Sequence, residues 1–79
     1  MEIKILGPGC PNCQKLEELA KIATKELGIN TKIEKVTDMI EIMKYTFTTP
    51  GLVVNGKIRH AGKILPSLEK VKEILKKEL

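Results

Sequence analysis

Apolar residues recur at three- and four-residue intervals in two stretches of the chain, which is the pattern of an amphipathic helix. The first stretch, Pro11–Leu27, predicts the longest helix, with Pro11 in its first turn and Gly28 just past its end. The second, Pro66–Leu79, predicts a helix that closes the chain. The apolar face of this second helix comprises Leu68, Val71, Ile74, Leu75 and Leu79.

Four shorter runs, bounded by turn residues, predict strands. Two of them, Glu2–Leu6 and Asn30–Val36, flank the first helix, so a right-handed crossover makes them parallel. The other two, Leu52–Val54 and Lys57–His60, are separated by Asn55-Gly56, the strongest short-range signal of a two-residue hairpin turn. We therefore expect a mixed sheet with an antiparallel hairpin at its edge.

A short helix is expected between the second and third strands. Asp38 followed by Glu41 resembles a capping box, and the apolar residues after Asp38 continue to about Lys44. The elements then follow the order βαβαββα, which is an α/β fold. A chain of 79 residues is too short for two cores, so we expect residues 1–79 to form a single domain.

Composition excludes several classes of function. Aromatic residues make up 3% of the chain, too few for base stacking, which argues against nucleic acid as a partner. The net charge of +4 is spread along the chain and fits solvated helix faces as well as a phosphate-binding patch. No apolar run approaches a membrane span and no signal-peptide pattern is present, so we expect a cytoplasmic protein without membrane attachment. Abundant Lys, Glu and Ile with a single Gln favour a heat-adapted source.

The two cysteines, Cys10 and Cys13, lie where the first predicted strand gives way to the first helix. In a reducing cytoplasm such a pair is not a structural disulfide framework. A helix start offers free backbone N–H groups and a positive dipole end, both of which favour a thiolate at Cys10. Cys13 follows one turn later on the same face, within bonding reach but shielded. This arrangement predicts thiol–disulfide exchange, with Cys10 as the attacking nucleophile and Cys13 as the resolving thiol.

A soft-metal carrier for copper or zinc is the alternative, because the same cysteine spacing supplies half of many zinc sites. Such carriers follow the order βαββαβ and end on a strand, whereas this chain ends on a predicted helix and has no methionine in the loop ahead of Cys10. A degenerate fold that only binds partners is a third hypothesis, and the presence of both cysteines speaks against it. Two thiols and one histidine offer at most three soft ligands, one short of a closed zinc site, so we expect the chain to be metal-free as a monomer. Thiol–disulfide exchange by the two cysteines needs no organic cofactor.

The whole chain resembles the thioredoxin/glutaredoxin superfamily, particularly its small archaeal and bacterial thioredoxin-like proteins. The motifs that carry the resemblance are Gly9-Cys10-Pro11-Asn12-Cys13, Thr49-Pro50, and Asn55-Gly56 followed by Gly62. The resemblance implies a four-stranded mixed sheet in the order 2-1-3-4 with helices on both faces. It also implies a cis Thr49-Pro50 bond that faces a redox-active Cys10–Cys13 disulfide.

By the same resemblance, four residues are expected to contact substrate, namely Pro11, Asn12, Thr49 and Pro50. The substrates would be disulfide-containing proteins. The upstream reductant would be either a thioredoxin-reductase-type protein or glutathione. Typical thioredoxins carry a tryptophan before the first cysteine and Gly-Pro between the pair, whereas Pro11 in this chain is closer to the glutaredoxin pattern.

Four other residues are expected to have ordinary structural roles. His60 is expected to be exposed on the edge hairpin rather than to bind a metal or accept a proton. Tyr45 and Phe47 border the loop before the third strand, and we expect them to pack in the core rather than to line a substrate groove. Lys15 is expected to be solvated rather than to act on a neighbouring thiol.

Overall fold

A computed structural model describes residues 1–9 and 11–78, so Cys10 and Leu79 lie outside the described residues. The elements are β1 (Ile3–Leu6), α1 (Pro11–Leu27), β2 (Ile33–Val36), α2 (Met39–Met43), β3 (Gly51–Val54), β4 (Lys57–Ala61) and α3 (Leu68–Lys77). This is the βαβαββα order that the hydrophobic pattern predicts.

The strands form a mixed sheet in the order β2-β1-β3-β4. β1 runs parallel to β2 and antiparallel to β3, and β3 pairs antiparallel with β4. The two central strands are buried almost throughout because both of their faces are covered, whereas the edge strands carry exposed side chains. The strand order confirms the architecture that the resemblance implied.

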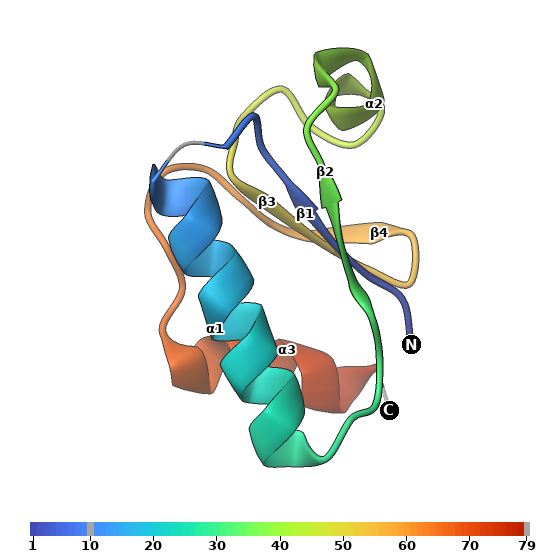
Figure 1. The fold of residues 1–79 in the computed structure, drawn as a ribbon, viewed down its shortest axis with the longest axis vertical. Coiled ribbons are helices and arrows are strands. Elements are labelled where there is room, and N and C mark those ends of the chain that lie inside the picture. The colour runs from blue at the N-terminus through green and yellow to red at the C-terminus, as the bar shows by residue number, and fades with distance from the viewer. Residues whose placement is uncertain (10, 79) are drawn as a thin grey trace.

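Helices cover both faces of the sheet, in two layers of unequal size. α1 and α3 lie together on one side, while α2 lies apart from them (Figure 1). The larger core cluster joins the sheet to α1 and α3 through Ile3, Ile5, Leu16, Ala20, Ala23, Leu52, Val54, Val71 and Leu75. The smaller cluster joins it to α2 through Leu6, Ile42 and Val53. Successive strand residues point to opposite faces, so β1 supplies Ile5 to the larger cluster and Leu6 to the smaller one.

The long helix α1 begins and ends at the predicted residues. After Leu27 the backbone turns left-handed at Gly28, with φ of 70°. The Gly28 N–H donates to the Lys25 carbonyl at 3.2 Å, and the Ile29 N–H donates to the Thr24 carbonyl at 2.9 Å. A glycine satisfies the last helical carbonyls in this way without steric strain at Cβ.

Two predicted boundaries were too early by two or more residues. α3 begins at Leu68 rather than Pro66, because the Ser67 hydroxyl caps it by accepting the Lys70 N–H at 3.2 Å. The second strand begins at Ile33 rather than Asn30, because its pairing starts opposite Ile3 and the preceding residues have no strand beside them. The expected contribution of Leu79 to the apolar face of α3 lies outside the described residues.

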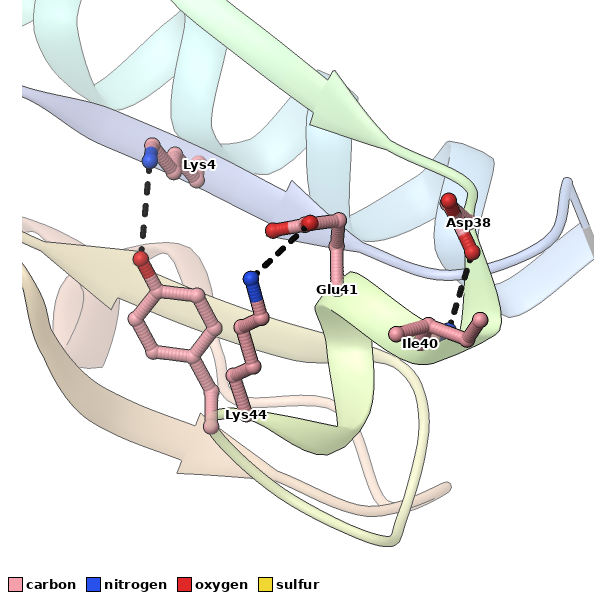
Figure 2. A network of polar contacts seen from close by, with 6 residues as sticks. Lys4, Asp38, Ile40, Glu41 and Lys44 are labelled. Carbon is pink, nitrogen blue, oxygen red and sulfur yellow. Dashed lines mark hydrogen bonds and ion pairs between the residues drawn. The ribbon is translucent and has the colours of Figure 1, made fainter.

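The short helix α2 lies where the pattern predicts, but only part of the predicted capping box forms. The Asp38 carboxylate accepts the Ile40 N–H at 2.9 Å, which caps the helix. The Glu41 carboxylate instead lies 3.0 Å from Lys44 Nζ, along the same helix (Figure 2). The exposed Lys44 ammonium competes for the carboxylate that the box would need.

A lysine contact links the sheet to the segment after α2. Lys4 Nζ donates a hydrogen bond to the Tyr45 hydroxyl at 3.5 Å (Figure 2). It also lies 3.8 Å from the Glu2 carboxylate. The hydrogen bond to Tyr45, with the attraction of Glu2, raises the pKa of Lys4. Tyr45 packs on the smaller core cluster, as predicted. The prediction that Phe47 packs was wrong, since its side chain is 85% exposed.

The loop that carries Phe47 explains this exposure. The Thr46 N–H donates a hydrogen bond to the Ile42 carbonyl at 3.0 Å. The Thr46 hydroxyl accepts a hydrogen bond from the Thr48 N–H at 3.2 Å. These local bonds turn the backbone between the two threonines outward, away from the core that receives Tyr45.

Glu78, at the end of α3, ties that helix to the β3–β4 hairpin. Its carboxylate accepts a hydrogen bond from Asn55 Nδ2 at 3.2 Å and pairs with Arg59. The Asn55 hydrogen bond, with the attraction of Arg59 and Lys57, holds the pKa of Glu78 below its ordinary value.

We predict that Glu78→Gln lowers the free energy of unfolding at pH 7 and that this difference shrinks in acid. A carboxyl whose pKa is lower in the folded chain adds stability above its unfolded pKa and loses it as pH falls through the folded pKa. Urea unfolding at pH 7 and in the acid range below the ordinary carboxyl pKa measures the effect. Glu73→Gln, which removes an exposed carboxylate from the same helix, is the control. A difference that does not change with pH would contradict the prediction.

We predict that Leu16→Ala lowers the free energy of unfolding by about 2–5 kcal/mol, because it leaves a cavity in a packed core. Leu16 is 0% exposed and belongs to the larger core cluster. Ile64→Ala is the control, because Ile64 is 88% exposed and its truncation should change stability by no more than about 0.5 kcal/mol. Equal losses in the two variants, measured by urea unfolding, would refute the packing assigned to Leu16.

Candidate functional site

The resolving cysteine of the sequence prediction, Cys13, lies in the first turn of α1, which begins close to the end of β1 (Figure 1). Cys13 is 5% exposed, so it is shielded as expected. Its sulfur lies against Gly7, the residue after β1, where a Cβ would be 2.1 Å from Cys13 Sγ. The Gly7 N–H donates to the Val36 carbonyl at 2.9 Å, which joins the ends of β1 and β2. A glycine at this point therefore allows the first turn of α1 to approach the sheet.

The predicted nucleophile, Cys10, lies outside the described residues. Among the residues that the structure describes, no cysteine is a free thiol. Lys15, two residues after Cys13, is exposed, as expected of a solvated helix lysine.

A hollow of about 340 Å³ brings together the four residues expected to contact substrate. It is lined by Pro11, Asn12, Thr49, Pro50 and Lys63. The Thr49-Pro50 bond is cis, which confirms the conformation implied by the resemblance. Pro50 is buried beneath the hollow, while Thr49 is partly exposed. Helix α1 and the loop before β3 thus meet at this hollow although they are far apart in the chain.

The loop after β4 completes the hollow. The Gly62 N–H donates to the Pro50 carbonyl at 3.0 Å, with Gly62 at a φ of 118° that favours glycine. This bond brings the exposed Lys63 to the rim, where it is the one charged side chain among the five described residues that line the hollow. The hydrophobic pattern does not predict that Lys63 belongs to the site. The one signal for Lys63 in the sequence is that it directly follows the motif residue Gly62.

A second, smaller cavity of about 100 Å³ lies between α1 and the ends of β1 and β2. It is lined by Ile5, Gly7, Gly9, Cys13, Gln14, Glu17, Lys35 and Thr37. The Glu17 side chain is 12% exposed, with Oε1 lying 3.3 Å from Lys35 Nζ and Oε2 3.7 Å from Lys21 Nζ. Sequence reasoning missed Glu17, although its position four residues after Cys13 places both on one helix face.

His60 is partly buried, so the prediction of an exposed residue was wrong. It pairs with Leu52, whose side chain belongs to the larger core, and directly opposite residues share a face of the sheet. Its Nε2 atom is buried and has no hydrogen-bond partner among the described residues. The register of β4 therefore directs the ring toward α1 and α3.

Two further findings concern the other function classes considered. Within residues 1–9 and 11–78, no group of three or more His, Cys, Asp or Glu side chains is placed to hold a metal ion. No helix in this part of the chain is both long enough and apolar enough to span a bilayer.

Comparison with known proteins connects this fold and site to a family. The thioredoxin domain family matches residues 1–76. A thioredoxin of Methanocaldococcus jannaschii is 48% identical over 77 residues, which cover 98% of this chain and 88% of that protein. A thioredoxin of Methanothermobacter thermautotrophicus is 45% identical over 76 residues, which cover 95% of this chain and 97% of that protein. The similarity thus extends over most of the length of both relatives.

We predict that Gly7→Ala destabilises the chain by about 1–3 kcal/mol, because the new methyl group overpacks against the Cys13 sulfur. It should also change the rate of thiol–disulfide exchange, because the first turn of α1 must move to relieve the contact. Gly28→Ala is the matched control: its Cβ would meet nothing within 4 Å, and its left-handed backbone costs about 1–2 kcal/mol. Urea unfolding and turnover of a protein disulfide check both effects. An unchanged exchange rate in Gly7→Ala would contradict the structural role given to Gly7.

Proposed function

Because this chain belongs to the thioredoxin domain family, we propose that it is a protein disulfide oxidoreductase that works through Cys10-Pro11-Asn12-Cys13. The observation that carries the proposal is the family match over residues 1–76, which spans this motif. The burial of Cys13 at the start of α1 and the neighbouring hollow support it.

In the proposed reaction, the Cys10 thiolate attacks one sulfur of a substrate disulfide. A mixed disulfide forms and the other substrate sulfur leaves as a thiolate. Cys13 then attacks the Cys10 sulfur, forms the Cys10–Cys13 disulfide and releases the second substrate thiolate. The substrate gains two electrons and the dithiol loses two, so the chain acts as an electron carrier and needs no metal or organic cofactor.

The hollow beside α1 would receive the polypeptide around the substrate disulfide. Thr49 is partly exposed there and can offer backbone groups to an extended chain, while Pro11 and Asn12 border the other side. Lys63 places a positive charge at the rim, which favours substrates with acidic residues near the disulfide.

The proposed setting is the cytoplasm, where a thioredoxin-reductase-type protein or glutathione would return the disulfide to the dithiol. The working unit is a monomer, since the proposed exchange needs the two cysteines of one chain. The lysine- and glutamate-rich composition fits a heat-adapted source.

A turnover assay coupled in parallel to a thioredoxin reductase and to glutathione with its reductase identifies the reductant. Failure of both systems to sustain turnover would contradict the proposed carrier role.

We predict that Cys10→Ser abolishes disulfide exchange, because no accessible nucleophile remains to form the mixed disulfide. Cys13→Ser should still attack substrate but accumulate mixed disulfides, visible on non-reducing gels. In the reduced chain, Cys10 should react with alkylating agents before the buried Cys13 does. Trapping by Cys10→Ser rather than by Cys13→Ser, or equal labelling of both thiols, would reverse the assigned roles.

A further inference from the structure

The turn between β3 and β4 contains the dipeptide Asn55-Gly56, in which a side chain can react with the backbone. The backbone nitrogen of the residue after an asparagine can attack the carbon of the side-chain amide, and a side chain on that next residue hinders the attack. Gly56 has no side chain, and a Cβ at its position would meet nothing within 4 Å. Both residues are exposed, so water reaches the turn. The dipeptide is therefore reactive by its own chemistry, and asparagine is among the thermolabile residues.

The other two asparagines of the chain lack this combination of features. Asn12 is partly buried in the first turn of α1 and precedes the buried Cys13. Asn30 is exposed but precedes Thr31, whose branched side chain crowds the backbone nitrogen. Exposure alone therefore does not single out Asn55, whereas exposure together with a following glycine does.

In the folded chain both polar atoms of the Asn55 side chain are held by other residues. Its Oδ1 accepts the Glu2 N–H at 2.9 Å, and its Nδ2 donates to Glu78 Oε2 at 3.2 Å. The Asn55 N–H also donates to the Glu2 carbonyl at 2.8 Å. These bonds direct the side-chain amide toward the start of β1 and the end of α3. Ring closure with the Gly56 nitrogen has to compete with them.

We propose that Asn55 is a site of spontaneous deamidation that the fold restrains, and that its conversion releases the end of α3 from the hairpin. In the first step the Gly56 nitrogen bonds to Asn55 Cγ, the Cγ–Nδ2 bond breaks, and the Gly56 amide proton leaves with Nδ2 as ammonia. In the second step water adds to one of the two carbonyl groups of the resulting cyclic imide. The ring then opens to aspartate or to isoaspartate. Neither cysteine takes part, so the inference does not depend on the proposed function.

Both products weaken the contact between the hairpin and α3. Aspartate has no N–H to donate to Glu78, and it brings a second negative charge to within about the same distance of that carboxylate. The Asn55 hydrogen bond is the main cause of the lowered pKa of Glu78, so its loss raises that pKa. Arg59 and Lys57 stay beside Glu78 and offset part of the repulsion. Isoaspartate adds a methylene to the main chain, which a two-residue hairpin turn does not accommodate.

The turn lies at the opposite end of β3 from the hollow. β3 begins at Gly51, next to Pro50, and ends at Val54, next to Asn55 (Figure 1). Deamidation therefore acts on the stability of the folded chain and not on the surface proposed to receive substrate.

The test measures loss of ammonia at each asparagine by peptide mass spectrometry, after the full chain is kept at elevated temperature and mildly alkaline pH. The unaltered chain is followed both folded and unfolded in guanidinium chloride. Folded Glu78→Ala is followed beside it, at a temperature below the unfolding midpoint of every variant. Glu73→Ala is the matched control, because it removes an exposed carboxylate from the same helix.

In the unfolded chain, Asn55 should convert before Asn12 and Asn30. In the folded chain its conversion should be slower by about tenfold or more, because two side-chain hydrogen bonds oppose it. Conversion should be faster in Glu78→Ala than in the unaltered folded chain, and unchanged in Glu73→Ala.

The consequence for stability is measured with Asn55→Asp, which reproduces one of the two products. Its urea unfolding midpoint should fall below that of the unaltered chain. Asn30→Asp is the control, because it makes the same change of charge at an exposed position. Equal midpoints in these two variants would overturn the proposed release of α3.

Conversion of Asn55 that is no faster than that of Asn30 in the unfolded chain would overturn the assignment of the site. Equal rates at Asn55 in the folded and unfolded chains would overturn the restraint by the fold. Equal rates in Glu78→Ala and Glu73→Ala would remove Glu78 from that restraint and contradict the proposal. If Glu78→Ala does not fold, Glu78→Gln replaces it, since its neutral amide holds Asn55 less strongly, and a rate equal to that of the unaltered chain is then the contradicting result.

Discussion

The approach of α1 to the end of β1 is the contact on which the site depends. It is possible because Gly7 has no side chain at the point where Cys13 Sγ arrives. The same glycine continues the parallel pairing by donating to Val36. The ends of two strands and the first turn of a helix are therefore held together within one short segment. Any side chain at Gly7 must displace either the helix or the sheet, because folded interiors have little free volume to absorb it.

This contact divides the surroundings of α1 into two sides with different character. One side is the open hollow over Pro50, which has Lys63 at its rim. The other is the small cavity between α1 and the strand ends, where Glu17 lies between two lysines. An open surface suits a macromolecular substrate. Cys13 lies in the first turn of the helix and is part of the lining of the small cavity.

The rest of the fold gives this arrangement a rigid base. α1 and α3 pack on one face of the sheet with a core of fully buried aliphatic side chains, and α2 closes the other face with a smaller one. Close packing on both faces leaves the central strands little freedom to shift. At the C-terminal end of α3, Glu78 accepts a hydrogen bond from Asn55 in the hairpin turn and pairs with Arg59 in β4. These contacts hold the last helix against the edge hairpin. The loop after β4 can then meet Pro50 through Gly62.

The sequence by itself determined the elements, because their signals are local. The 3.6-residue period of α1 and its terminal Gly28 predicted that helix to the residue, and Asn55-Gly56 predicted the hairpin, since both depend on the backbone preferences of neighbouring residues. The sheet order and the cis Thr49-Pro50 bond followed only from the family resemblance of the motifs, which no local rule supplies. For the site, the motifs indicated four of the five described residues that line the hollow.

Only the tertiary structure decided the features that depend on contacts between distant segments of the chain. From its sequence position, Glu17 is expected to be a solvated helix glutamate. In the structure α1 packs against β2, so the Glu17 side chain is largely buried and lies beside Lys35. His60 is partly buried, against expectation, because the register of β4 places it opposite Leu52. Lys63 reaches the hollow only through the bond of Gly62 to Pro50. Burial and proximity are set by contacts between residues distant in the chain, and periodicity along the sequence carries no record of them.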